Sequence, residues 1–275
     1  MKIAAIVHVF YPEMWPELRD CLKVVSADDL TVTYVDEKSV VEAKRDFPSA
    51  RFILCENRGY DVWPFVTALK SIDPSAFDLV VKLHTKRDIV KNHPFVMNGA
   101  LLNGSAWRDY LLAFVKTPED WKATLAAFDN PRVGLVADRH LVYGRSEGGK
   151  NWFDDAVREL KTNFSLRVPR GAWFVGGTMF AVRGKLLKVF ADHPFTAEMF
   201  AASGSHEPTT YAHLMERMLG LAVEAQGLRL AAFNGSVRLR RFLIALRRFF
   251  FDNRRSERRH TIRVLGVTVY RKKLA

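Results

Sequence analysis

Short apolar runs alternate with segments of helical spacing through the first third of the chain, and this rhythm constrains the fold more than any other feature. Strands separated by helical segments form βαβ units, whose strands lie parallel in one sheet. We therefore expect an α/β fold with a mostly parallel sheet. The expected strands are 3–10, 30–35, 51–55 and 78–83, and the expected helices are 14–25, 40–46 and 64–69.

The remainder of the chain is predicted to be more helical. Gly176 and Gly177 interrupt the apolar run 173–182, which otherwise predicts a strand. No linker, low-complexity run or internal repeat divides residues 1–235, so we expect one domain there. A further strand is expected at 133–137, and helices are expected at 104–116, 118–128, 151–164, 185–190 and 209–219.

Positive charge is concentrated at the C-terminal end of the chain. The 275 residues carry a formal net charge of +12. Residues 236–275 contain 13 Lys and Arg against two acidic residues, whereas residues 1–235 contain 29 basic and 28 acidic residues. A nucleic-acid-binding protein would instead interleave basic and aromatic residues on a folded platform. We therefore expect no nucleic-acid partner.

The basic tail, residues 236–275, has an amphipathic pattern. On a helical wheel the arginines of 237–251 lie mostly opposite an apolar stripe, which is typical of a helix in a membrane interface. Docking of this helix on residues 1–235 is the alternative. Residues 261–270 predict a strand pair around Gly266, and no apolar run is long enough to span a bilayer. The stripe consists of Leu239, Phe242, Leu243, Leu246, Phe249 and Phe250.

The N-terminus and the cysteines point to a reducing compartment. The apolar run 3–10 continues into Tyr11-Pro12-Glu13 without a small-residue cleavage site, which favours a strand over a signal peptide. Cys21 and Cys55 lie in apolar settings without metal or redox spacing, so we expect two buried thiols.

Polar residues follow the predicted parallel strands, where ligands bind in such sheets. Tyr11 and Asp36 follow the first two strands. The turn 57–61 follows the third strand, and Asn57, Arg58, Asp61 and its backbone N–H groups suit a nucleotide or sugar hydroxyls. The alternative is a plain turn in which Gly59 takes a positive φ and Asp61 caps the next helix.

Potential cations end the fourth strand. Lys82, His84 and Lys86 project to one side of an extended backbone. Because clustered cations repel one another, we expect an anion between them, the alternative being a solvated loop.

Two later segments carry further candidates. The pair Gly176-Gly177 indicates a bulge or a close approach of ligand to backbone. His213, Glu216 and Arg217 share a helix face. Glu207 precedes that helix, as a general base or a simple cap.

Five blocks in this order resemble the rhamnan synthesis F (RgpF) family of bacterial polysaccharide glycosyltransferases. The resemblance implies transfer of a sugar, often rhamnose, from a nucleotide diphosphate donor such as dTDP-rhamnose to a lipid-linked glycan of O-antigen or capsule. It places the protein at the cytoplasmic face of the inner membrane, beside other polysaccharide-assembly enzymes, and suits a GT-A-like, Rossmann-like fold. The blocks are NRGYDVWPF (57–65), VKLHTKRD (81–88), GSAWRDYLL (104–112), FVGGTMFAVR (174–183) and YAHLMERMLG (211–220).

The resemblance also implies roles for individual residues. Glu207 is the first choice for the base in an inverting displacement and Glu216 the second, with His213 and Arg217 orienting it. Donor binding falls to Asn57, Arg58, Gly59, Asp61, Lys82, His84 and Lys86, and acceptor binding to Trp107, Arg108, Gly176, Gly177 and Thr178.

The expected chemistry needs no resident cofactor. No Asp-x-Asp motif follows the fourth strand, and a cationic cluster can neutralise a leaving diphosphate in place of a metal. We therefore expect metal-independent transfer, with metal dependence left open. The rival function is a non-catalytic, membrane-recruited scaffold module of a polysaccharide assembly complex.

Overall fold

A computed structural model describes residues 1–89, 95–97, 100–145, 150–202, 210–256 and 259–273. The chain forms two compact units, Met1–Phe233 and Asn234–Ala275. Each unit has its own sheet.

A seven-stranded sheet of order β11-β7-β10-β4-β1-β2-β3 organises the first unit. All neighbouring strands are parallel except β10, which runs antiparallel to both β4 and β7. This confirms the predicted Rossmann-like α/β fold with a mostly parallel sheet. The strands are β1 (Ile3–Val9), β2 (Asp29–Tyr34), β3 (Arg51–Leu54), β4 (Leu79–His84), β7 (Val133–Asp138), β10 (Phe180–Arg183) and β11 (Arg229–Phe233).

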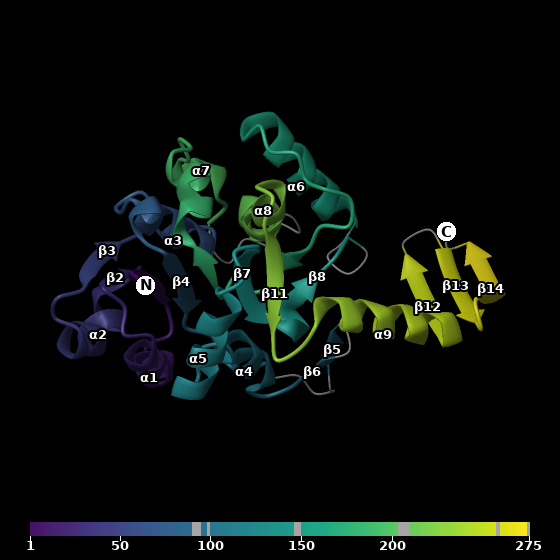
Figure 1. The fold of residues 1–275 in the computed structure, drawn as a ribbon, viewed down its shortest axis with the longest axis horizontal. Coiled ribbons are helices and arrows are strands. Elements are labelled where there is room, and N and C mark those ends of the chain that lie inside the picture. Colours follow the sequence, from purple (N-terminus) through teal and green to yellow (C-terminus); the bar gives the residue numbers. More distant parts are fainter. Residues whose placement is uncertain (90–94, 98–99, 146–149, 203–209, 257–258, 274–275) are drawn as a thin grey trace. The chain divides into compact units, whose positions relative to one another are not determined.

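Helices cover both faces of this sheet (Figure 1). α3 and α8 contact each other on one face, and α1 and α5 contact each other on the opposite face. β1 and β4 are buried along their whole length, as central strands of such a sandwich must be. The α-helices are α1 (Trp15–Val25), α2 (Val41–Asp46), α3 (Val62–Leu69), α4 (Ala106–Leu112), α5 (Pro118–Ala127), α6 (Lys150–Asn163), α7 (Lys188–Ala191) and α8 (Tyr211–Ala225). The 3₁₀ helices are η1 (Pro12–Met14), η2 (Glu37–Val40), η3 (Pro74–Ala76), η4 (Arg139–Leu141), η5 (Gly184–Leu187) and η6 (Ala197–Met199).

The apolar run 173–182 differs from its prediction as one strand. It forms β9 (Phe174–Val175) and β10, which belong to different sheets, with a turn between them. Gly177 at φ +78° and Thr178 at φ +55° make this turn. β9 pairs with β8 (Val142–Tyr143), and β5 (Phe95–Met97) pairs with β6 (Ala100–Leu102).

The second unit is a helix followed by a small antiparallel sheet. α9 (Val237–Phe250) leads directly into β12 (Phe251–Ser256), which pairs with β13 (Arg259–Val264). β13 pairs in turn with β14 (Val267–Lys273). The amphipathic helix and the strand pair around Gly266 were predicted, and β12 adds a third strand. Within the part of the chain that the structure describes, no helix combines the length and the apolarity needed to cross a bilayer.

Candidate active site

The carboxyl ends of β1 and β4 form the crevice where ligands bind in sheets of this kind. After β1 the chain builds β2 and β3 on one side and then returns to β4 on the other side of β1. The Thr85 hydroxyl links the segments that follow the two strands, because it accepts hydrogen bonds of 2.9 Å from the Phe10 and Tyr11 N–H groups.

A buried ion pair lies beside this crevice. The Lys82 ammonium donates to Asp61 Oδ2 at 2.5 Å and to Thr178 Oγ1 at 2.9 Å, and the Thr178 hydroxyl donates to Asp61 Oδ2. Lys82 is 2% exposed and the Asp61 side chain is 19% exposed. Phe65 of α3 covers the ammonium, with its ring centroid 5.2 Å away.

This pair changes the interpretation of the cations that end β4. Asp61 of the protein itself supplies a negative charge beside Lys82 and His84. An anionic ligand near Lys86 stays a prediction. Burial alone raises the pKa of Asp61, but His84, Lys82 and the hydrogen bonds from Lys82 and Thr178 lower it below its ordinary value. Burial lowers the pKa of Lys82, against the attraction of Asp61. Of the three predicted cations, Lys86 alone is partly exposed.

Two buried histidines extend the polar cluster along the sheet. His8 and His84 are partners in the β1–β4 register. His8 Nδ1 lies 3.1 Å from Thr33 Oγ1, and His84 Nδ1 lies 3.5 Å from Asp61 Oδ2 without a hydrogen bond. Burial lowers the pKa of His8 to about 4 and that of His84 to about 3, so both rings are neutral at pH 7. His8 and Thr85 were not predicted as site residues, although their places in and after buried strands were a usable signal.

Two residues next to Asp61 have positive φ angles. Tyr60, which precedes it, has φ +55°, and Thr178, which binds it, also has φ +55°. Such conformations are uncommon for residues other than glycine and cluster at functional sites. Gly59 at φ +58° lies so close to Phe200 that an added Cβ would be 2.7 Å from its ring.

A second carboxylate is attached to the same turn. Glu216 Oε1 accepts a 2.6 Å hydrogen bond from the Gly177 N–H, and Glu216 Oε2 pairs with Arg217 at 3.0 Å. The Arg217 guanidinium packs over the rings of Trp152 and Phe174. Residues 177 and 178 therefore fix Glu216 on one side and Asp61 on the other.

His213 lies one helical turn before Arg217. Its ring centroid is 5.7 Å from those of both Tyr60 and Trp152, and its Nδ1 lies 2.8 Å from Thr210 Oγ1. Burial lowers the pKa of His213. The structure thus brings the predicted His213, Glu216 and Arg217 next to the turn 57–61.

The glycine pair is explained by packing within the protein. An added Cβ at Gly176 would lie 2.3 Å from the Tyr143 ring, and one at Gly177 would lie 2.5 Å from Leu111 and 3.1 Å from Trp107. The neighbours that an added Cβ would meet at both glycines are side chains of this chain. Acceptor binding by Gly176 and Gly177 stays a prediction.

The other predicted residues have local partners or lie at the surface. Arg58 pairs with Glu56 at 2.8 Å and donates to the Phe200 carbonyl, and Asn57 is exposed. Glu207 lies outside the described residues.

Arg108 lies beside the segment that follows β4. Its guanidinium pairs with Glu17 at 2.5 Å and with Asp88, and it reaches the Lys86 carbonyl. Both acidic partners already neutralise Arg108.

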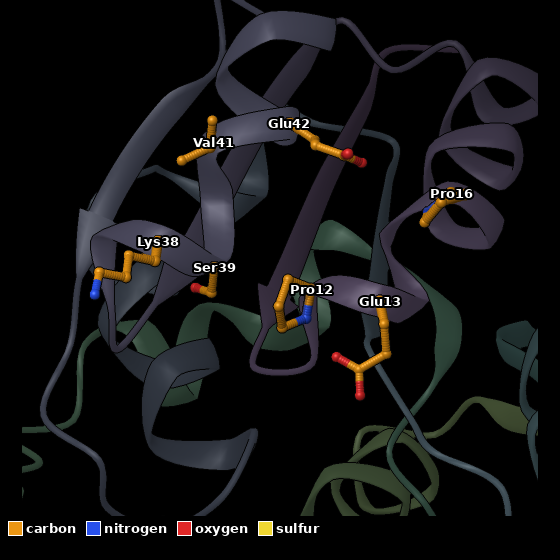
Figure 2. A pocket seen from close by; sticks show the side chains of 7 residues that line it. All are labelled: Pro12, Glu13, Pro16, Lys38, Ser39, Val41 and Glu42. Atoms are coloured by element: carbon orange, nitrogen blue, oxygen red, sulfur yellow. The ribbon is translucent and has the colours of Figure 1, made fainter.

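A hollow of about 440 Å³ opens between the segments that follow β1 and β2 (Figure 2). Ser39 is fixed at its base, because its hydroxyl donates to the Asp36 carbonyl at 2.6 Å. Tyr11 and Asp36 were predicted at these strand ends, whereas the hollow was not predicted. Its lining residues are Pro12, Glu13, Pro16, Lys38, Ser39, Val41 and Glu42.

No group of three His, Cys, Asp or Glu side chains that could hold a metal ion occurs within the described ranges. The charged groups that the structure places at the crevice are Asp61, Lys82, Lys86, Glu216 and Arg217.

Charged side chains lie at the switch point of a mostly parallel sheet, which is the place where α/β domains of this class bind ligands. The chain belongs to the rhamnan synthesis protein F (RgpF) family, which it matches over residues 1–228. This confirms the resemblance seen in the five sequence blocks and indicates a part in polysaccharide synthesis.

Two curated relatives are similar to this chain. Both are called "Uncharacterized protein WxcX" and come from two strains of Xanthomonas campestris pv. campestris. Each is 28% identical over 232 residues, which cover 81% of this chain and 31% of the relative. The chain thus spans about a third of the length of these relatives.

Two solved structures are similar at lower identity. A CMP:2-keto-3-deoxy-manno-octonic acid synthetase complexed with CTP is 12% identical with a TM-score of 0.39, covering 90% of this chain and 100% of that one. A 4-diphosphocytidyl-2C-methyl-D-erythritol synthase from Anaerococcus prevotii is 11% identical with a TM-score of 0.40, covering 90% of this chain and 98% of that one.

Proposed function

We propose that this protein is an inverting glycosyltransferase of cell-surface polysaccharide synthesis. It moves a sugar, rhamnose before others, from a nucleotide diphosphate sugar such as dTDP-rhamnose to a lipid-linked glycan of O-antigen, capsule or rhamnan. One observation carries the proposal: two carboxylates, Asp61 and Glu216, are fixed on one turn beside the crevice of a member of the RgpF family.

The donor would occupy the crevice and the hollow next to it. The hollow suits the nucleoside, since Glu13, Ser39 and Glu42 offer acceptors to ribose hydroxyls. The diphosphate would then lie near Lys86 and the N–H groups after β4. The partly exposed Asp61 carboxylate would accept from a donor-sugar hydroxyl.

Lys82 and His84 are buried next to Asp61, so their proposed part in donor binding is indirect. At pH 7, where His84 is neutral, Lys82 keeps Asp61 ionised. The proposal also assigns donor binding to Asn57, Arg58 and Gly59. It assigns acceptor binding to Trp107, Arg108 and Thr178.

The reaction is a direct displacement. The acceptor hydroxyl oxygen attacks the anomeric carbon, the bond to the diphosphate oxygen breaks with its electron pair, and a carboxylate takes the hydroxyl proton. Asp61 is the weaker base because its pKa is lowered by its partners. Glu207 remains the first choice for the base, and Glu216 is the choice among the described residues.

Separate Glu207→Gln and Glu216→Gln variants test the base. Loss of the base is expected to lower turnover by about 10²- to 10⁴-fold. Donor binding, measured by calorimetry, should remain in the same variant. Near-normal turnover in both variants would contradict this part of the proposal.

Transfer without a metal is also part of the proposal. Positive charge near the leaving diphosphate is what the reaction needs, and Lys86 with backbone N–H groups would supply it. Activity that disappears in EDTA and returns with Mg²⁺ or Mn²⁺ would overturn this point.

A panel of nucleotide sugars, assayed for nucleotide release, tests the function as a whole. A transferase releases nucleotide from one donor above the others. A non-catalytic, membrane-recruited scaffold of a polysaccharide assembly complex would release none. The proposed location is peripheral, on the inner face of the cell membrane, where residues 236–275 would hold the protein.

A further inference from the structure

Exposed apolar side chains are concentrated in the C-terminal unit. Along α9 they follow the spacing of one helix face, and they stay exposed although α9 contacts β12 and β13. This face, the α9 stripe, consists of Leu239, Phe242, Leu243 and Leu246.

A second exposed group forms where α9 ends. The Leu265 and Gly266 N–H groups donate to the Phe250 and Phe249 carbonyls at 3.1 and 2.8 Å, so the β13–β14 turn is tied to the end of the helix. Phe251, Val264 and Val267 are register partners and share one face of the sheet. The resulting apolar end consists of Phe249, Phe250, Phe251, Val264, Leu265 and Val267, all of them exposed.

Leu265 is in an unfavourable place for a protein surrounded by water alone. It has φ +50° and, with Gly266, forms a two-residue hairpin turn. Such turns favour Asn or Asp followed by Gly. Leu265 nevertheless stands at the tip with 55% of its surface exposed. A large apolar side chain at a strained tip indicates a surface that is covered by something apolar.

The same face of the sheet becomes polar and then basic away from the apolar end. Tyr270 lies in the next row, paired with Ile262, and Lys272 lies in the row beyond, paired with His260. Arg271, Lys272 and Lys273 are all exposed. An apolar tip, a tyrosine and then a lysine follow the order of hydrocarbon, interface and headgroup in a bilayer.

We propose that residues 234–275 bind an anionic lipid bilayer by inserting the apolar end, with the α9 stripe lying in the interface. The charge of this unit favours a bilayer over a second copy of the chain. Its 13 Lys and Arg against two acidic residues complement anionic headgroups, whereas a second copy would bring two cationic units together. The proposal is independent of the transferase assignment, since a scaffold could bind the same surface.

Sedimentation of the full chain with vesicles tests this proposal. Binding to phosphatidylcholine vesicles containing phosphatidylglycerol should exceed binding to phosphatidylcholine alone and should weaken with added salt. Leu265→Asn should lower the partition coefficient roughly tenfold, because an apolar side chain leaves the hydrocarbon. The melting temperature should not fall, because Asn accepts a positive φ readily.

Two further variants separate insertion from charge. Lys272→Gln with Lys273→Gln should weaken binding roughly fivefold per lysine, at low salt only. Leu54→Asn removes an equally exposed leucine from the first unit and should leave vesicle binding unchanged.

Several outcomes would overturn the proposal. These are absence of binding to anionic vesicles, binding that Leu265→Asn leaves intact, or a self-associated full chain that Leu265→Asn dissociates in analytical ultracentrifugation. The last result would assign the apolar end to a second copy. Nucleotide release, measured on the same variants, tests the transferase proposal separately from membrane binding.

Discussion

Lys82 and Asp61 form an ion pair that costs the protein stability to bury. Replacing such a pair by apolar residues is often neutral or stabilising, whereas removing one partner leaves a buried charge without compensation. Here the pair also holds the Thr178 hydroxyl, and through it the turn whose Gly177 N–H binds Glu216. The geometry of two carboxylates therefore depends on one buried ammonium.

Asp61→Asn tests this dependence. It should lower the free energy of unfolding by about 3–5 kcal/mol, because Lys82 keeps its charge without its partner. Asp61→Asn combined with Lys82→Met should recover much of that loss while turnover stays low. Urea unfolding measures both variants. An Asp61→Asn protein as stable as the wild type would show that the pair is not coupled as described.

The buried histidines predict a pH dependence of stability. Both pKa values are lower in the folded protein than the ordinary value of 6.5, so below pH 6.5 the unfolded chain binds more protons. The contribution of the two neutral rings to the free energy of unfolding is therefore present in full above pH 6.5. It falls as pH decreases toward 4 for His8 and toward 3 for His84. Between pH 6.5 and pH 5 the loss should be about 2 kcal/mol per histidine.

Urea unfolding at pH 7.5 and at pH 5 measures this loss. His8→Gln should remove about half of the difference between the two pH values, since a single buried imidazole then remains in the cluster. Equal unfolding free energies at both pH values in the wild type would contradict the burial of two neutral rings.

At the scale of elements, the periodicity of apolar residues predicted the strands of the βαβ units. It missed strands that form only because another segment of the chain pairs with them. The β-branched runs at β1, β2 and β4 are visible in sequence. β11 has the sequence RLAAF and β12 the sequence FDNRRS, which lack such runs. Both are strands because a neighbouring strand pairs with them.

The candidate site was predicted as separate motifs and not as one cluster. The turn 57–61, the end of β4 and the helix carrying Glu216 were each singled out. Nothing in the spacing indicates that Asp61 neutralises Lys82, because this contact depends on how α3 packs over the sheet. The antiparallel direction of β10 brings Thr178 to the same point, and this too is a tertiary property.

A side chain at position 177 should destabilise the turn between β9 and β10. Gly177→Ala adds a Cβ that would lie 2.5 Å from Leu111 at φ +78°. We expect a loss of about 2–3 kcal/mol from strain and overpacking together. Turnover should also fall, because the displaced turn no longer fixes Glu216.

Gly227→Ala is the matched control for this change. Gly227 has φ +81° with nothing within 4 Å of an added Cβ, so it reports the conformational cost alone, about 1 kcal/mol. Thermal unfolding compares the two variants. Equal losses would show that packing at Gly177 adds nothing.

At the scale of the whole molecule, charge and architecture divide the chain near the same place. Residues 1–235 carry 29 basic and 28 acidic residues, the first compact unit ends at Phe233, and the family match ends at residue 228. Every charged group of the candidate site comes from the first unit. The second unit holds nearly all of the excess positive charge.

A chain truncated to residues 1–235 tests whether this division is functional. It should unfold cooperatively with an unchanged melting temperature and release nucleotide from the same donor, because the sheet and the site remain complete. It should lose affinity for anionic vesicles, since its net charge falls from +12 to +1. Transfer to an acceptor embedded in such vesicles should fall more than transfer to a soluble acceptor, because membrane binding raises the local concentration of the lipid-linked substrate. Vesicle binding that persists in the truncated chain, or loss of nucleotide release with a soluble acceptor, would contradict the separation of membrane binding from chemistry.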